Sequence, residues 1–140
     1  MNKLRLLPLV FSFLCLITLS SCGKDDDADP SRKAILSAGV WQGNKFYVDG
    51  DDWTSFVDID NTSMEFKSDG TYIFEISGDS ETGTWELTSN DQKILMDKNT
   101  SGEATADILK LTNTALNISF TEEDPDTGED SVLEIRFIRD

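Results

Sequence analysis

The residues of this sequence that could do chemistry are almost all carboxylates. It has 27 Asp and Glu and 12 Lys and Arg among 140 residues, and it has no His. The lack of His excludes the Ser-His and Cys-His nucleophile pairs and the commonest general base. Catalysis would have to rest on paired carboxylates, as in a glycosidase, or on a Ser-Lys arrangement. No motif brings such groups together, so we expect that the protein is not an enzyme.

One acidic segment, DPDTGED at 124–130, has the composition of a calcium loop. Oxygen ligands occupy alternate positions and Gly128 allows a turn, but the twelfth-position glutamate of an EF-hand is missing. The segment also lies at the expected tip of a hairpin. We therefore expect a solvated loop at 122–130, no bound metal and no cofactor.

The chain begins with a segment typical of a secretory signal. Residues 1–21 carry Lys3 and Arg5, followed by an apolar run from Leu6 to Leu19 that is too short for a transmembrane helix. The end of that run, LSSC, resembles the lipobox of bacterial lipoproteins. The resemblance implies that Cys22 is acylated, with palmitate as an expected acyl group, and becomes the mature N-terminus. The alternative is an ordinary signal peptide with a chance cysteine.

An acidic stretch follows the expected lipidation site. Residues 22–30, CGKDDDADP, contain no apolar side chain large enough to bury, which is typical of a tether. The lysine and acidic run also resemble the export signal of surface-displayed lipoproteins in Bacteroidetes-type bacteria. That resemblance implies attachment to the outer membrane through an N-terminal lipid, on the cell surface. The alternative is a spacer that leaves the protein on the periplasmic face.

The overall charge excludes one class of partner. The formal net charge is −15, and removal of the leader with its two basic residues makes the mature chain more acidic still. Such a body is repelled by phosphate backbones, so we expect no nucleic-acid partner. Cleavage before Cys22 leaves only that cysteine, so no disulfide within the mature chain is expected.

Residues 64–87, MEFKSDGTYIFEISGDSETGTWEL, predict a β-meander. Ser68-Asp69-Gly70 is suited to a three-residue hairpin loop, which places Phe66 opposite Tyr72 and Met64 opposite Phe74. Opposed residues share a face, so these four form one apolar stripe. A second turn expected at 78–81 would place Phe74 opposite Trp85 and Tyr72 opposite Leu87.

Further alternating segments extend the meander in both directions. A first strand is expected at 40–48, a second at 53–59, and later ones at 93–97, 104–112, 115–121 and 133–138. The strand pairs predicted across the later turns include Trp85 with Met96, Leu109 with Ile118, and Asp107 with Phe120. The last pair makes Asp107 a carboxylate on the inner face, either at the rim in water or in contact with a ligand.

Residues 31–38 can form one or two helical turns, with Ser31 as the N-cap and Gly39 ending the helix. We expect Ala34, Ile35 and Ala38 to lie against the sheet, so that the segment acts as a plug or lid.

Together these segments predict an all-β domain over residues 31–140. Eight to nine strands joined by short turns make an up-and-down antiparallel sheet, and closing it into a β-barrel removes its exposed edges. The alternative is a two-sheet sandwich, which usually needs crossover connections that the turn lengths do not provide.

Four sequence motifs carry a resemblance to a known family. They are GVW at 39–41, MEFKSDGTY at 64–72, GTWEL at 83–87 and LEIRF at 133–137. Together they resemble the lipocalin-like domain of small bacterial lipoproteins. The resemblance implies a calycin-type barrel in which Trp41 plugs the closed end. The second and third motifs of vertebrate lipocalins are absent, so a transport role is not implied.

A barrel of eight strands either fills itself with side chains or holds one small ligand. The inner face predicted here includes six aromatic residues that could stack on an apolar guest: Phe66, Tyr72, Phe74, Trp85, Phe120 and Phe137. Two functions stay open. The barrel binds a small apolar or amphipathic molecule without transforming it, or it is packed solid and serves as an interaction or accessory module for another envelope protein.

Overall fold

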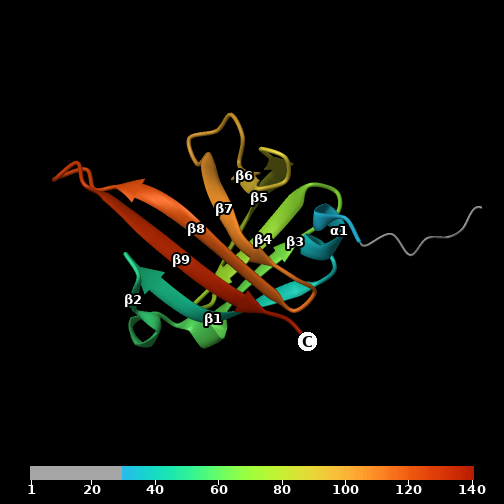
Figure 1. Cartoon of the computed structure of the whole chain (residues 1–140), viewed down its shortest axis with the longest axis horizontal. Helices are drawn as coiled ribbons and strands as arrows, with labels where there is room; N and C mark the ends of the chain where they lie inside the picture. The colour runs from blue at the N-terminus through green and yellow to red at the C-terminus, as the bar shows by residue number, and fades with distance from the viewer. Residues whose placement is uncertain (1–29) are drawn as a thin grey trace, which may run out of the picture.

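The computed structural model describes residues 30–140 (Figure 1). The predicted signal peptide at 1–21, Cys22 and nearly all of the tether lie outside the described residues. The elements in chain order are α1 (Arg32–Leu36), β1 (Val40–Val48), β2 (Asp51–Asp52), η1 (Thr54–Phe56), η2 (Ile59–Asn61), β3 (Thr62–Phe66), β4 (Thr71–Ile76), β5 (Asp79–Thr88), β6 (Lys93–Met96), β7 (Ala104–Leu111), β8 (Ala115–Glu123) and β9 (Asp130–Ile138).

The strands form a closed antiparallel barrel, as the sequence predicted. Each strand from β3 to β9 pairs with its neighbour in the chain, β1 pairs with β3, and β9 returns to pair with β1. The short β2 adds a ninth strand at the end of β1. Because the first and last strands pair, the sheet has no long free edge, and the sandwich alternative is excluded.

The first hairpin of the meander matches its prediction. Phe66 lies opposite Tyr72 and Met64 opposite Phe74. Gly70 has a φ of 90°, and the amide of Lys67 donates to the carbonyl of Thr71 over 2.8 Å. The Asp69 carboxylate accepts from the Thr71 amide over 2.9 Å, which fixes the loop. Local turn chemistry therefore sets the register of this pair.

The second hairpin was predicted wrongly. Its turn consists of Ser77 and Gly78, both at positive φ (52° and 91°), as a two-residue type I′ turn requires, rather than the four residues 78–81. Phe74 therefore lies opposite Glu81 and Tyr72 opposite Gly83. The pairing differs by four residues, an even number, so every side chain of β5 keeps the face that the prediction gave it.

The strand predicted at 53–59 was also wrong. The connection from β1 to β3 instead contains the two short 3₁₀ helices η1 and η2. The amide of Thr54 donates to the Asp52 carboxylate over 2.9 Å, and the Thr62 hydroxyl donates to the Asp58 carbonyl over 2.8 Å. These local side-chain bonds offer the backbone an alternative to a strand ladder, which is why apolar alternation was misleading here.

A register shift between β7 and β8 overturns two predicted pairs. The ladder slips between Ile108 and Lys110, so Ile118 lies opposite Ile108 and Asp107 lies opposite Ser119. The extra residue, Leu109, is consequently exposed. One extra residue shifts the alternation of side chains by one position, so the residues of β7 before the bulge lie on the face opposite to the predicted one. Asp107 thus points outward, where its carboxylate pairs with the Lys93 ammonium over 2.8 Å.

Helix α1 closes one end of the barrel (Figure 1). As predicted, the Ser31 hydroxyl caps it by accepting from the Ala34 amide over 3.1 Å. The residue that reaches the core is Leu36, which is fully buried, whereas Ala34 and Ala38 are exposed. The prediction that those two alanines lie against the sheet was wrong, since the short helix turns Leu36 toward the barrel.

The end of the barrel covered by α1 is tightly packed. Trp41 is fully buried there, and its indole Nε1 donates to the Leu36 carbonyl over 2.9 Å. The Arg139 guanidinium lies 4.0 Å from the centre of the Trp41 ring and donates to the Ile35 carbonyl over 3.1 Å.

Within residues 30–140, no helix is long and apolar enough to cross a membrane.

Candidate ligand cavity

The half of the barrel away from α1 holds a cavity of about 410 Å³. Its wall comes from all eight strands of the barrel, β1 and β3 to β9, and from the loop between β6 and β7. The lining residues are Phe46, Met64, Tyr72, Phe74, Glu81, Met96, Asp97, Gly102, Ala104, Ile118, Phe120, Glu122, Leu133 and Ile135. Most of these are apolar, so the cavity is suited to a guest with an apolar body.

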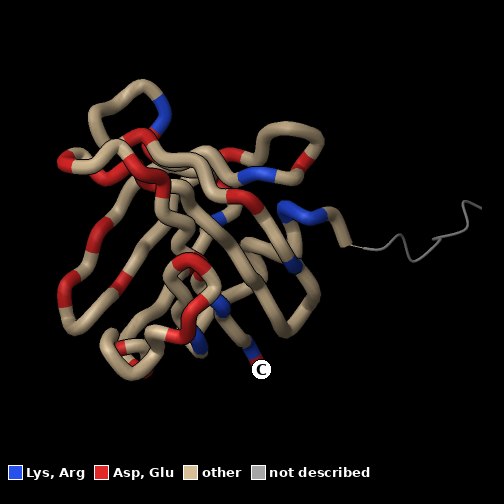
Figure 2. The backbone as a smooth tube through the Cα atoms, turned by 60° about the vertical axis from the view of Figure 1, so that its left-hand side comes forward, with Lys and Arg blue, Asp and Glu red and all other residues tan. Residues whose placement is uncertain are grey.

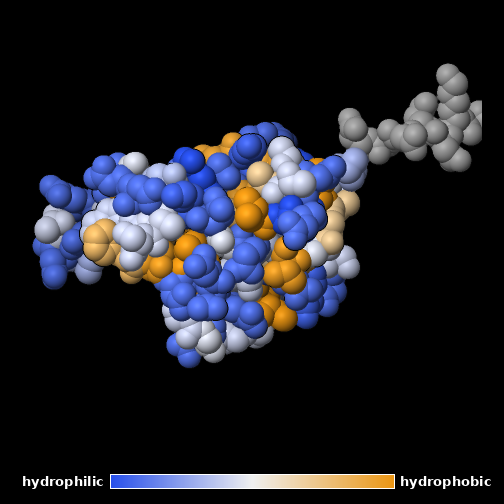
Figure 3. All heavy atoms as spheres, turned by 90° about the horizontal axis from the view of Figure 1, so that it is seen from below, coloured by the Kyte–Doolittle hydropathy of each residue, from blue (hydrophilic) through white to orange (hydrophobic). Residues whose placement is uncertain are grey.

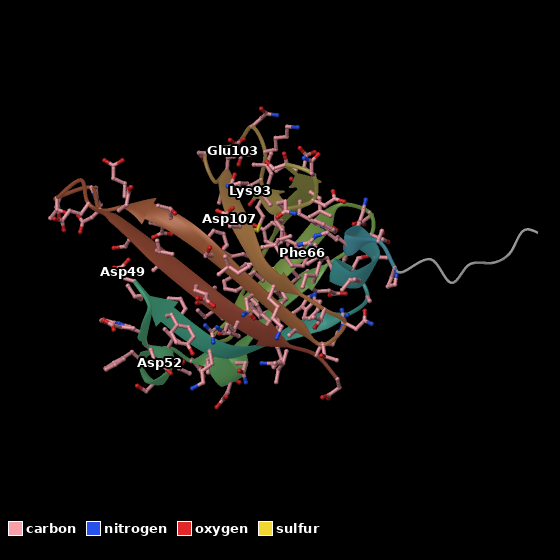
Figure 4. The ribbon with its side chains drawn as sticks, viewed as in Figure 1. Asp49, Asp52, Phe66, Lys93, Glu103 and Asp107 are labelled. Carbon is pink, nitrogen blue, oxygen red and sulfur yellow. The ribbon has the colours of Figure 1, made fainter. Side chains whose placement is uncertain are left out.

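The six aromatic residues named as candidate ligand contacts fall into two groups. Tyr72, Phe74 and Phe120 line the cavity. Phe66, Trp85 and Phe137 are buried in the packed half, where the Phe66 and Trp85 rings meet edge to face with centroids 5.1 Å apart. Figure 4 shows Phe66 inside the barrel toward α1. The second group therefore belongs to the hydrophobic core between the cavity and α1, and does not line the cavity.

The two polar aromatic groups that needed partners both find them within the protein. The Trp85 indole Nε1 donates to the Lys67 carbonyl over 2.9 Å. The Tyr72 hydroxyl donates to Asp97 Oδ2 over 2.6 Å. Burial, and then the bond to Asp97, raise the pKa of the Tyr72 hydroxyl above its usual value of 10.0. Tyr72 is therefore a neutral donor in this site.

Asp97 is a functional candidate that the sequence analysis missed. It sits at the end of β6 with a φ of 51°, and its second oxygen, Oδ1, accepts from the Thr84 amide over 3.0 Å. Gly83 makes room for it, because a Cβ there would clash with Asp97 Oδ1 and lie 2.7 Å from Cε1 of Tyr72. The signal that could have revealed it is the glycine itself, since a glycine inside a strand often marks a close approach by another group.

A side groove lies beside the cavity, where β7 and β8 are no longer paired. Their ladder starts only at Asp107 and Ser119, and Figure 1 shows β7 rising away from the β8–β9 hairpin beyond that point. The groove has a volume of about 470 Å³ and shares Ala104, Phe120 and Glu122 with the cavity. The groove and the cavity therefore adjoin each other at these three residues.

Charge around these openings is mainly negative. Glu81, Asp97 and Glu122 line the cavity, and none of its lining residues is Lys or Arg. The groove adds one cation, Lys93, whose ammonium is already paired with Asp107 (Figure 4). Figure 2 shows that the hairpin loops turned away from α1 carry mostly Asp and Glu. Low-dielectric walls concentrate the field of such carboxylates in the opening.

The acidic loop at the tip of the β8–β9 hairpin is held by its own hydrogen bonds. Asp124 Oδ1 accepts from the amide of Asp126 over 2.8 Å and from that of Thr127 over 3.1 Å. Gly128 takes a φ of 70° to close the turn. The Asp124 carboxylate thus has a local structural role. Within residues 30–140, no three acidic or cysteine side chains lie close enough together to hold a metal ion.

A comparison with protein families decides the classification. The family described as "Lipocalin-like domain" matches residues 38–118, which is more than half of the chain. The chain belongs to the lipocalin-like domain family. The matched region contains Trp41, the meander and the strands as far as the first part of β8, so the resemblance to a lipocalin-like domain is confirmed.

Solved structures similar to this lipocalin-like domain include odorant-binding proteins from cattle. A deswapped triple mutant of the bovine protein is 19% identical over 76% of this chain and 74% of its own, with a TM-score of 0.48. The same protein in complex with a selenium-containing odorant is 18% identical over 79% and 73% of the two chains, with a TM-score of 0.49. Among curated proteins, none matches the chain.

Proposed function

We propose that this lipocalin-like protein is a lipid-anchored lipoprotein of the cell envelope whose barrel binds a small apolar or amphipathic molecule without transforming it. The observation that carries this proposal is the cavity of about 410 Å³ in the half of the barrel away from α1. That volume is within the range of known ligand sites, roughly 300–1,000 Å³.

The way the aromatic side chains are divided supports binding over a barrel packed solid. Trp85 packs in the closed half, while Met64, Phe74 and Met96 line the cavity without filling it. The wall is apolar apart from a few polar groups, of which Tyr72 and Asp97 are fixed by hydrogen bonds. Such a site can bury an apolar body and orient one polar end.

Native mass spectrometry of the protein purified from its own cells tests the binding function. We expect an excess mass on the folded protein that is released on unfolding and that gives the mass of the ligand. A matched variant, Ala104→Trp, should fill the cavity and lose the excess mass while the protein stays folded. A folded protein without excess mass, whose Trp fluorescence does not respond to a panel of lipids and aromatic compounds, would refute the proposal.

The anchor and the location are tested separately. Cells fed an alkyne analogue of palmitate should label the protein through Cys22, and Cys22→Ala should abolish the label and release the protein from membranes. Protease added to intact cells should remove the barrel if it is displayed on the cell surface. Resistance in intact cells, with cleavage after the outer membrane is opened, would place the protein on the periplasmic face.

A second candidate function is supported by an exposed aromatic pair. Trp53 and Phe56, beside the open end of the barrel, are 44% and 75% exposed and have ring centroids 5.2 Å apart. Figure 3 shows the lower face of the molecule as mostly hydrophilic with separate hydrophobic patches. Exposed aromatic residues are typical anchors of protein interfaces, so the pair could bind another envelope protein.

Photo-crosslinking in cells tests this second function. A photoreactive amino acid at position 56 should give one reproducible protein adduct, whereas the same residue at position 109, where Leu109 is 55% exposed, should not. Equal labelling at both positions, or none at either, would argue against a docking surface.

A further inference from the structure

The cavity wall contains a carboxylate that is held in one orientation. Asp97 receives the Tyr72 hydroxyl on Oδ2 over 2.6 Å and the Thr84 amide on Oδ1 over 3.0 Å. Tyr72 is only 8% exposed, and Gly83 leaves the space that the carboxylate occupies. Each carboxylate oxygen can accept more than one hydrogen bond, so Asp97 keeps the capacity to receive a donor from a ligand.

Two further carboxylates of the cavity wall form no ion pair. The ion pairs within residues 30–140 join Lys45 to Asp52, Lys93 to Asp107, Lys98 to Glu86, and Arg136 to Glu134. Glu81 and Glu122, which line the cavity, take part in none of these pairs. A cation that enters the opening would therefore meet uncompensated negative charge, whereas an anion would be repelled.

We propose that the ligand of this cavity is an amphipathic amine, with its apolar body between Met64, Phe74, Ile118 and Ile135 and its ammonium group on Asp97. Glu81 and Glu122 add attraction at the opening. This inference rests on the proposed ligand-binding function and adds the sign of the ligand's charge. Charge-assisted hydrogen bonds from an ammonium to a fixed carboxylate are stronger than those from a neutral hydroxyl.

Competition among three matched ligands tests the proposal. The purified chain is loaded with the apolar fluorophore N-phenylnaphthylamine, which is then displaced by decylammonium, decanol or decanoate below their micelle concentrations. We expect decylammonium to displace the probe at roughly five- to tenfold lower concentration than decanol, with decanoate the weakest. The preference should shrink as salt is raised from about 0.01 M to 0.5 M.

The outcomes separate this inference from the proposed function. Equal displacement by the three ligands, or stronger displacement by decanoate, would overturn the amine proposal and leave a binding barrel. No binding of the probe or of any of the three ligands would overturn both.

Charge-neutral variants test the residues. Asp97→Asn should weaken decylammonium about fivefold to tenfold and leave decanol nearly unchanged. Because an amide side chain at position 97 could disturb the bond to Tyr72, Glu81→Gln and Glu122→Gln provide variants on the rim, each expected to weaken the amine about two- to fivefold. Glu65→Gln on the outer face of β3 is the control for net charge. If Glu65→Gln changes the preference as much as the rim variants do, a specific site is refuted.

Discussion

Three residues meet at very close range in the wall of the cavity. Gly83 lies on β5, Tyr72 on β4 and Asp97 directly after β6. The Tyr72 hydroxyl is hydrogen-bonded to Asp97, and both side chains lie so close to Gly83 that a Cβ there would clash with them. Asp97 also occupies the left-handed region, with a φ of 51°, which is uncommon for a residue with a side chain. Because the three residues pack so closely, adding even one atom at this point should disturb the contact.

Adding one methyl group at Gly83 should therefore destabilise the fold. In Gly83→Ala the Cβ would clash with Asp97 and lie 2.7 Å from Cε1 of Tyr72, so one of these side chains must move. We expect a loss of about 1–3 kcal/mol in the free energy of unfolding, measured by urea denaturation. The control is Gly102→Ala, whose Cβ would have no atom closer than 3.7 Å and should cost less than about 0.5 kcal/mol. Equal losses for the two variants would contradict this account.

The raised pKa of Tyr72 gives stability a defined alkaline limit. The folded state holds the phenol proton more tightly than the unfolded chain, where the pKa is about 10. The contribution is thus complete below about pH 10 and is lost as the pH rises above it. We expect the free energy of unfolding of the wild type to fall more steeply above about pH 10 than that of Tyr72→Phe. Parallel curves would show that Tyr72 ionises equally easily in both states.

At the scale of elements, α1 has little stability of its own. A helix of five residues is too short to persist alone in water, so its position depends on tertiary contacts. These contacts are the buried Leu36 side chain, the bond from Trp41 to the Leu36 carbonyl and the bond from Arg139 to the Ile35 carbonyl. The helix is therefore part of the closed end of the barrel.

Truncation of Leu36 should loosen this end. Leu36→Ala removes a fully buried side chain, and we expect a loss of about 2–4 kcal/mol in the free energy of unfolding. Hydrogen exchange of the α1 amides should accelerate more than that of β8. Ala34→Ser, on the exposed face of the same helix, should change stability by less than about 0.5 kcal/mol. A small effect of Leu36→Ala would mean that α1 docks through other contacts.

At the scale of the whole molecule, the barrel has one packed half and one hollow half. Trp41, Phe66 and Phe137 are at most 1% exposed below the cavity floor, while Phe120 borders the cavity. The packed half supplies stability, and the hollow half is free to hold a guest. This division of one barrel into two regions predicts different costs for the same substitution.

Substitution of one phenylalanine in each region, Phe137 on β9 and Phe120 on β8, compares how much the two regions contribute to stability. Phe137→Ala opens a void in a filled core and should cost about 3–5 kcal/mol in the free energy of unfolding. Phe120→Ala only enlarges a space that is already present and should cost less, about 1–2 kcal/mol. It should also weaken binding of the N-phenylnaphthylamine probe. Similar losses of stability would mean that the hollow half is packed in solution.

Much of the barrel follows from the sequence alone, because strand alternation and turn chemistry are local. The SDG loop set the register of Phe66 with Tyr72, and the alternation of apolar residues placed Trp85 inside even though its predicted partner was wrong. An error of four residues in the second turn changes partners and keeps faces, since side chains alternate with a period of two. The closed up-and-down fold was accordingly predicted correctly despite that error.

The details of the site depended on interactions that no local pattern encodes. The bulge at Leu109 moved Asp107 from the predicted inner face to an outer pair with Lys93. Whether eight strands leave a void depends on the summed volumes of side chains that are distant in the sequence, so the same aromatic residues were equally compatible with a cavity and a packed core. Only the tertiary structure assigned Phe66 to the core and Phe120 to the cavity, and brought Asp97 against Tyr72.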